Sequence, residues 1–219
     1  MTTFADDPDL HVYLFLAGWG PRAETAIQIA ARVQGLVRLL GEIEPEWSEI
    51  WPILAARAIR PEEPHVLQLS TDDLGMLIDR RARFDPPRWP APVGPDGYQI
   101  VFGANRIGID PMKFEMSVHA GSTEAETYIG NGLLLSPHDD GPIWRDEARG
   151  RAVVEAIIDC FEPDWVNAGA TGGAPLGNTG PRAWLNWAAP GCVPPEHFRP
   201  PSPGVVVDTL SGGALQYWE

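Results

Sequence analysis

The feature that most constrains the fold is a strand followed by an amphipathic helix between His11 and Leu40. Residues 11–16 form a continuous apolar run, which is typical of a buried strand. After a break that ends with Pro21 and Arg22, apolar residues recur every three or four positions, which predicts a helix. Pro21 suits the first helical position and Gly41 suits the C-cap. The apolar stripe consists of Ile29, Val33, Leu36, Val37 and Leu40.

The two faces of this predicted helix differ in polarity, so the helix should pack on one side only. We expect the stripe to pack on a sheet, because a strand and an amphipathic helix must bury their apolar faces together. That sheet is expected to contain Val12, Leu14 and Leu16. The opposite face, expected in solvent, carries Glu24, Gln28, Arg32 and Arg38.

The remaining elements predict an α+β fold. Helices are expected from Ser70 to about Arg83 and from Asp146 to Phe161. Alternating strands are expected at residues 98–102, 113–119 and 130–135, and a hairpin crosses Ser211 and Gly212. Residues 165–168 suggest a short strand, and residues 181–187 fit a short helix or an edge strand. The whole chain, residues 1–219, is therefore expected to be one domain, with a central, mainly antiparallel sheet and helices packed against it.

The charge balance narrows the choice of partner. The formal net charge is −14, and Lys113 is the only lysine. Nucleic-acid binding needs positive charge to displace counterions, so no direct nucleic-acid contact is expected. A basic protein partner fits this balance, because complementary charge accelerates encounter. Solubility alone is the alternative reason for an acidic surface.

Targeting signals are not evident in the sequence. No basic segment precedes an apolar run at the N-terminus, and the first strand is too short to cross a bilayer. Cys160 and Cys192 are too few for a disulfide framework. We therefore expect a cytoplasmic protein without a membrane partner, while the sequence leaves the oligomeric state open.

One acidic segment is also rich in tryptophan. Trp47 and Trp51 lie among four carboxylates, and together with Ile50 and Leu54 they are predicted to share one helical face. The pair suits either core packing or a partner interface, where aromatics often dominate binding. We expect part of an interface here, with a second acidic cluster near Trp144 as another part. The predicted interface residues are Glu42, Glu44, Glu46, Trp47, Glu49, Trp51, Asp139 and Asp140.

Catalytic constellations are missing from the sequence. There is no His-Glu-x-x-His, paired-cysteine or Gly-x-Ser-x-Gly motif, and His138–Asp140 suits an exposed loop better than a metal site. The sequence therefore predicts no enzyme, no cofactor and no metal. The alternative is an enzymatic or small-molecule-binding domain that uses the glycine-rich segment 167–180 and the region of Cys192 and His197.

Three ordered stretches carry a resemblance to a known family. They are Trp19-Gly20-Pro21-Arg22-Ala23-Glu24, Phe161-Glu162-Pro163-Asp164-Trp165 and Ala183-Trp184-Leu185-Asn186-Trp187. In order and spacing the chain resembles the immunity protein 52 family of bacterial polymorphic-toxin systems over nearly its whole length. The resemblance implies a small cytoplasmic protein that neutralises a cognate toxin, in some cases a nuclease, delivered by a contact-dependent or type VI secretion system. We expect the motif residues themselves to be structural.

Overall fold

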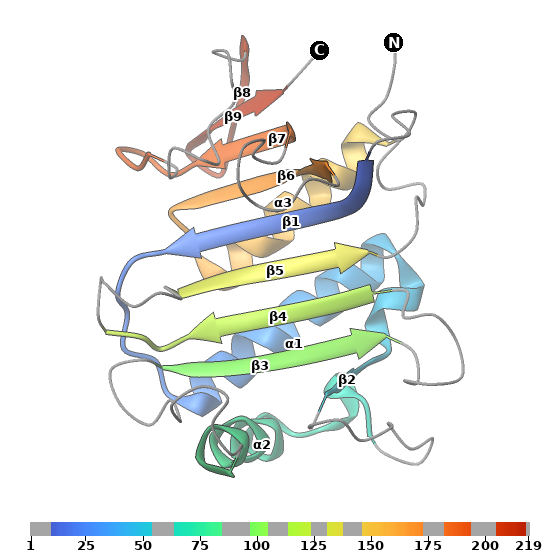
Figure 1. Cartoon of the computed structure of the whole chain (residues 1–219), viewed down its shortest axis with the longest axis vertical. Helices are drawn as coiled ribbons and strands as arrows, with labels where there is room; N and C mark the ends of the chain where they lie inside the picture. The colour runs from blue at the N-terminus through green and yellow to red at the C-terminus, as the bar shows by residue number, and fades with distance from the viewer. Residues whose placement is uncertain are drawn as a thin grey trace. The chain divides into compact units, whose positions relative to one another are not determined.

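The computed structural model describes residues 10–53, 64–84, 97–104, 114–123, 131–137, 146–172, 182–193 and 205–217. These residues form an α+β fold with three α-helices packed against an antiparallel sheet of nine strands, as predicted (Figure 1). The chain divides into two units, one formed by residues 1–18 and 134–219 and the other by residues 19–133. The expectation of a single domain stays a prediction.

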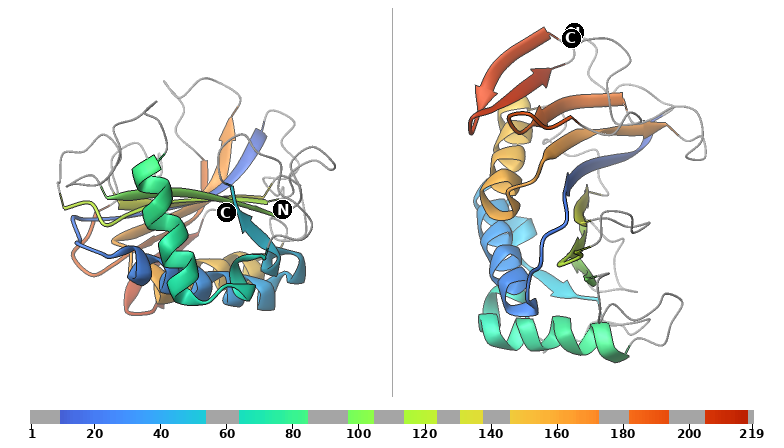
Figure 2. Two further views of the ribbon diagram at one scale, coloured as in Figure 1. Left: turned by 90° about the horizontal axis from the view of Figure 1, so that it is seen from below. Right: turned by 90° about the vertical axis from the view of Figure 1, so that its left-hand side faces the viewer.

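The sheet of the 19–133 unit contains β2 (Ile50–Pro52), β3 (Tyr98–Ala104), β4 (Phe114–Ala120) and the start of β5 (Asn131–Pro137). Side chains of β4 alternate between buried and half-buried along the strand, which confirms the predicted period of two. In Figure 1 and Figure 2, helix α1 (Ala26–Ile43) covers one face of β3 and β4. The apolar side chains of these strands and of α1 therefore form the core of this unit.

Helix α1 begins later than the sequence pattern predicted. Its N-cap is Thr25, whose side chain accepts a hydrogen bond from the Gln28 backbone N–H, while Gln28 Oε1 accepts from the Thr25 N–H. Pro21 therefore precedes the helix, and Gly41 lies within its last turn instead of capping it. The predicted stripe is confirmed, because all five of its members are buried: Ile29, Val33, Leu36, Val37 and Leu40.

A buried glutamine fastens α1 to the segment that leads into helix α2 (Thr71–Phe84). Gln34 donates to the backbone oxygens of Val66 and Leu69, at 3.2 and 2.8 Å, and accepts from Thr71 Oγ1 at 2.7 Å. These bonds satisfy a buried side chain amide, which would be costly to leave unpaired. The predicted start of α2 is confirmed, since Ser70 Oγ accepts from the Asp73 N–H at 3.1 Å.

The segment between α1 and α2 differs from its prediction. Residues 45–48 form a single 3₁₀ turn, η2 (Pro45–Ser48), and strand β2 follows; a second such turn, η3 (Val66–Gln68), precedes α2. Because side chains alternate along a strand, Ile50 is buried on one face and Trp51 is half-buried on the other. Trp47, Ile50 and Trp51 therefore do not share a helical face, and Leu54 lies outside the described residues.

In the other unit, strand β1 (Leu10–Trp19, of which residues up to Gly18 belong here) pairs with β6 (Trp165–Gly172). Within this part of β1, Phe15, Ala17 and Gly18 are buried, whereas Leu14 and Leu16 are half-buried. A continuous apolar run does not reveal which alternate residues face the core. The side chain of Val12 lies outside the described residues.

Helix α3 (Glu147–Phe161) packs against β6 in the same unit. Its N-cap is Asp146, which accepts from the N–H groups of Ala148 and Arg149 at 3.0 and 3.3 Å. Its C-cap is Glu162, which adopts the left-handed conformation with φ 48°. The predicted bounds are therefore confirmed within one residue. Its apolar stripe is buried and comprises Val153, Val154, Ile157, Ile158 and Phe161.

Three further strands complete this unit. β7 (Arg182–Ala188) lies between β6 and β9 (Gly213–Tyr217), so it is neither the helix nor the edge strand that were predicted. β8 (Val205–Leu210) and β9 form the predicted hairpin. Ser211 and Gly212 both have positive φ, 47° and 78°, as a two-residue hairpin turn requires. Among the described residues, no helix has the length and apolar character needed to cross a membrane.

Candidate functional site

The acidic segment after α1 is positioned by the end of that helix. The Glu44 N–H donates to Leu40 O at 2.8 Å, and Pro45 then begins η2. Glu42, Glu46 and Glu49 are exposed and Glu44 is half-buried, so the carboxylates are displayed on the surface of this unit. We call Glu42, Glu46 and Glu49 the acidic cluster. Because these three side chains are exposed, a positively charged partner could reach them.

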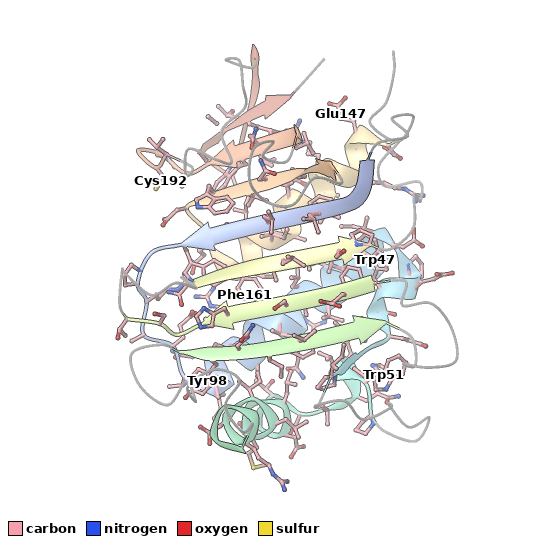
Figure 3. All side chains as sticks on the ribbon, in the orientation of Figure 1. Trp47, Trp51, Tyr98, Glu147, Phe161 and Cys192 are labelled. Atoms are coloured by element: carbon pink, nitrogen blue, oxygen red, sulfur yellow. The ribbon has the colours of Figure 1, made fainter. Side chains whose placement is uncertain are left out.

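The two tryptophans of this segment have different environments, and Figure 3 labels both. Trp47 is 6% exposed and stacks on Phe114, with ring centroids 4.9 Å apart. Trp51 is half-buried and meets the His65 ring edge-on at 6.0 Å. Trp47 is therefore a core residue that presents almost no surface to a partner, in line with the core-packing interpretation. Of the two, Trp51 retains the larger exposed surface.

The second part of the predicted interface, Asp139 and Asp140, lies outside the described residues, as does Trp144. The described carboxylates of the prediction all belong to the segment from Glu42 to Glu49. Among the predicted interface carboxylates, the exposed ones that the structure describes are therefore those of the acidic cluster. Whether a partner uses it stays a prediction.

The thiol of Cys192, labelled in Figure 3, lies in the turn after β7. Its Sγ donates to Asp164 Oδ1 at 3.6 Å, and the turn is tied by a bond from the Ala189 N–H to Asp164 O. Burial and the nearby Asp164 carboxylate raise the pKa of the Cys192 thiol. A raised pKa lowers the thiolate fraction, and the thiolate is the nucleophile. This geometry therefore disfavours the alternative of a cysteine nucleophile; His197 lies outside the described residues.

The glycine-rich segment is partly strand. Residues 167–172 belong to β6, and their backbone pairs with β1 and β7. Residues 173–180 lie outside the described part of the chain. Across that described part, no three His, Cys, Asp or Glu side chains come together as a metal-binding group.

Sequence reasoning missed an ionic cluster at the start of α1. Glu24, whose side chain is 4% exposed, lies between Arg32 Nε at 2.6 Å and Arg22 Nε at 3.3 Å. The Arg22 guanidinium also lies 5.3 Å from the centre of the Trp19 ring. The sequence placed Glu24 on the solvent face because it started the helix at Ala23. The capping-box pattern Thr25-x-x-Gln28 would have moved that start and taken Glu24 out of the helix.

The loop before α1 is held by a neighbouring asparagine. Asn131 Nδ2 donates to the backbone oxygens of Gly20 and Ser122, at 2.8 and 3.0 Å, and Asn131 Oδ1 accepts from the Ser122 N–H. The Arg22 N–H in turn donates to Ser122 O at 2.8 Å. The ionic cluster therefore stands on a fixed backbone, and its role is to secure the approach to α1.

The stretches that carry the family resemblance lie at buried junctions, as expected for structural residues. Trp19, Phe161 and Trp187 are all buried. Trp187 Nε1 donates to Leu210 O at 2.8 Å, which ties β7 to β8. The Trp165 ring covers Gly18, where an added Cβ would lie 2.6 Å from the indole. These contacts show that these motif residues pack in the interior of the protein.

No protein-family model matches this chain, and no match was found among curated proteins. The class that the fold defines is an α+β protein with an antiparallel sheet and an acidic surface cluster.

Proposed function

We propose that this chain is an immunity protein that binds a cognate bacterial polymorphic toxin and neutralises it by stoichiometric protein–protein contact. The observation that carries the proposal is the exposed acidic cluster in a chain of net charge −14. A basic toxin surface, such as the cleft of a nuclease effector from a type VI or contact-dependent secretion system, would be its charge complement. The protein would act in the cytoplasm, where an incoming toxin reaches its target.

Neutralisation by binding needs surface complementarity and no catalytic group. A specific interface of standard size covers about 800 Å² on each partner. Charged groups at its rim mainly increase the association rate, because long-range attraction steers the encounter. The three carboxylates of the acidic cluster have the exposure that this role requires.

The rival function, an enzyme acting through Cys192, has less support. The Cys192 thiol donates to Asp164, and its pKa is raised by burial and by that carboxylate. A nucleophilic cysteine instead needs an environment that favours the thiolate. Stoichiometric inhibition needs only an exposed surface of complementary charge, whereas catalysis by Cys192 would need a thiolate that its surroundings disfavour.

The test is protection of a poisoned cell. The toxin gene expected beside the gene for this chain is expressed alone and together with this chain, and survival is counted. The proposal predicts that co-expression restores growth and that the two purified proteins form a complex in a 1:1 ratio. Cells that die equally fast in both cultures would show that the proposed function is wrong for this pair. An unrelated immunity protein expressed at the same level serves as the control.

A further inference from the structure

The sheet of the 19–133 unit has one face that packs on α1 and one outer face on the opposite side. Figure 2 shows α1 on one side of these strands. Buried and half-buried residues alternate along β2 and β4, and the buried ones belong to the core beneath α1. The outer face therefore carries the half-buried members, which are Trp51, Glu115, Ser117 and His119.

Strand register places Trp51 and Glu115 in one row across this outer face. Trp51 pairs with Gly103 of β3, and Gly103 pairs with Glu115 of β4. Neighbouring strands lie about 4.8 Å apart, so the Cα atoms of Trp51 and Glu115 are separated by roughly 10 Å. The residue between them, Gly103, contributes no side chain. A single side chain of a partner that lies over this row is therefore within reach of both the indole and the carboxylate.

His65 adds a second aromatic ring beside Trp51. Both side chains are half-buried, their ring centroids are 6.0 Å apart, and the two ring planes meet at 82°. Two rings at nearly a right angle form a corner with π-electron density on its walls. The negative face of an aromatic ring attracts cations, and cages of several rings bind cationic groups in this way. The corner therefore favours a positively charged ligand.

Glu115 supplies a full negative charge to the same row. Its side chain is half-buried, and among the residues that the structure describes none forms a hydrogen bond or an ion pair with its carboxylate. Strands β2, β3 and β4 contain no arginine or lysine. His119, the other ionisable residue of β4, lies four positions away, about 13 Å along the strand. A carboxylate partly removed from water gains most from a cationic partner.

The acidic cluster lies at the same end of the sheet as this row. Trp47, which belongs to the same segment as the cluster, stacks on Phe114 with ring centroids 4.9 Å apart. Phe114 directly precedes Glu115 on β4. Figure 3 shows Trp47 and Trp51 at this end of the sheet. A basic surface attracted by the acidic cluster therefore arrives beside the row of Trp51 and Glu115.

We infer that Trp51, His65 and Glu115 form a binding site for an arginine side chain of the toxin. This inference rests on the proposed function and names the contact that the toxin makes. A guanidinium is planar, so it stacks on an indole and at the same time donates two hydrogen bonds to a carboxylate. A second copy of this chain is the weaker candidate, because it would bring another net charge of −14 to the acidic cluster.

The experiment measures binding of the toxin domain encoded by the adjacent gene, made inactive by substitution, to the full chain. Glu115→Gln should raise Kd about tenfold or more, because it removes the charge and keeps the shape. Glu155→Gln, at a half-buried glutamate of α3 in the other unit, is the matched control and should stay within about twofold of the wild type. Trp51→Leu should also raise Kd about tenfold, whereas Trp51→Phe, which keeps an aromatic face, should stay within about threefold.

A double-mutant cycle identifies the partner of the site. The arginines of the toxin domain are replaced by alanine one at a time, and each variant is measured against the wild-type chain and against Glu115→Gln. One arginine should couple to Glu115, so that removing both groups weakens binding little more than removing either one. Replacing that arginine by lysine should restore only part of the affinity, because an ammonium group lacks the planar fork.

Equal melting temperatures of variant and wild type show that a lost affinity reflects contact and not unfolding. If Trp51→Leu melts earlier than the wild type, Glu115→Gln and the double-mutant cycle decide the question. If Glu115→Gln binds within about twofold of the wild type, or if its effect adds fully to that of every toxin arginine, the inferred site is wrong and the proposed function stands. If the wild type does not bind the toxin, both proposals are wrong. Self-association that Glu115→Gln abolishes while toxin binding persists would assign the site to a second copy and overturn the inference.

Discussion

The substitution Glu24→Gln tests the ionic cluster before α1 most sharply. The side chain of Glu24 is 4% exposed, and its carboxylate lies 2.6 Å from Arg32 Nε and 3.3 Å from Arg22 Nε. At these distances a charge pair near a protein surface is worth about 5 kcal/mol before desolvation is subtracted. Glutamine keeps the shape and one acceptor but leaves two arginines without their shared carboxylate. Because both arginine side chains are about one quarter exposed, water can solvate their guanidinium groups in the variant and so offset part of the lost free energy.

We expect Glu24→Gln to lower the free energy of unfolding by about 2–3 kcal/mol, which for a chain of this size corresponds to a drop in Tm of roughly 4–12 °C. Urea unfolding followed by tryptophan fluorescence and thermal melting followed by circular dichroism would both measure it. The double variant Glu24→Gln/Arg32→Gln should lose less than the sum of the two single variants, because each single variant already removes the ion pair that the two residues share.

The matched control is Glu155→Gln, whose carboxylate pairs with Arg151 across one helical turn at 3.7 Å while 44% exposed. An exposed pair of this kind contributes about 0–0.5 kcal/mol, so the control should barely change stability. If Glu24→Gln costs less than about 0.5 kcal/mol, or no more than Glu155→Gln does, then the buried ionic cluster does not stabilise the approach to α1.

Three further predictions concern packing and chemistry. Val33→Asp should cost several kcal/mol by burying an unpaired charge at a fully buried position, and an unchanged Tm would contradict our core. Gly75→Ala should destabilise by about 1–2 kcal/mol despite its better helix propensity, because the new Cβ meets the backbone of Ile27; a variant more stable than wild type in urea would contradict this. At pH 8 Cys192 should be alkylated more slowly than an ordinary exposed cysteine, since its raised pKa leaves less thiolate. The variant Asp164→Asn should speed the reaction, because it removes the carboxylate beside the thiol. Peptide mass spectrometry measures the alkylation rates, and equal rates in the wild type and in Asp164→Asn would count against the Asp164 contact.

Periodic patterns in the sequence predicted the three α-helices and the alternating strand β4, although not the start of α1. The buried stripe of α1, the bounds of α3 and the alternation in β4 were all confirmed, because each reflects a local pattern of burial. The hairpin at Ser211 and Gly212 was confirmed, since a two-residue hairpin turn requires positive φ and both residues have it.

The errors arose where the outcome depends on contacts between distant segments. The apolar run of β1 has no polar residue to mark a face, so the sequence did not reveal that Phe15 and not Leu14 is buried. Trp47 was placed on a helical face, but its burial depends on stacking with Phe114, 67 positions later. The pairing of Glu24 with Arg32 depends on where α1 starts, which the capping residues determine. The binding surface is the least predictable part, because exposure alone does not identify a partner.

The salt dependence of toxin association shows whether the acidic cluster attracts the toxin during encounter. The variant Glu42→Lys/Glu46→Lys/Glu49→Lys removes the acidic cluster, and Glu147→Lys/Glu155→Lys/Asp159→Lys makes the same change in net charge on α3. We predict that the first variant associates about tenfold more slowly at low salt with a flatter salt slope, because exposed charges act within a screening length of ~8–10 Å. The second should stay within about threefold of the wild type and keep its slope. If the acidic-cluster variant associates with the wild-type rate and the wild-type salt dependence, or if both variants associate equally slowly, then the acidic cluster is not the surface that attracts the toxin.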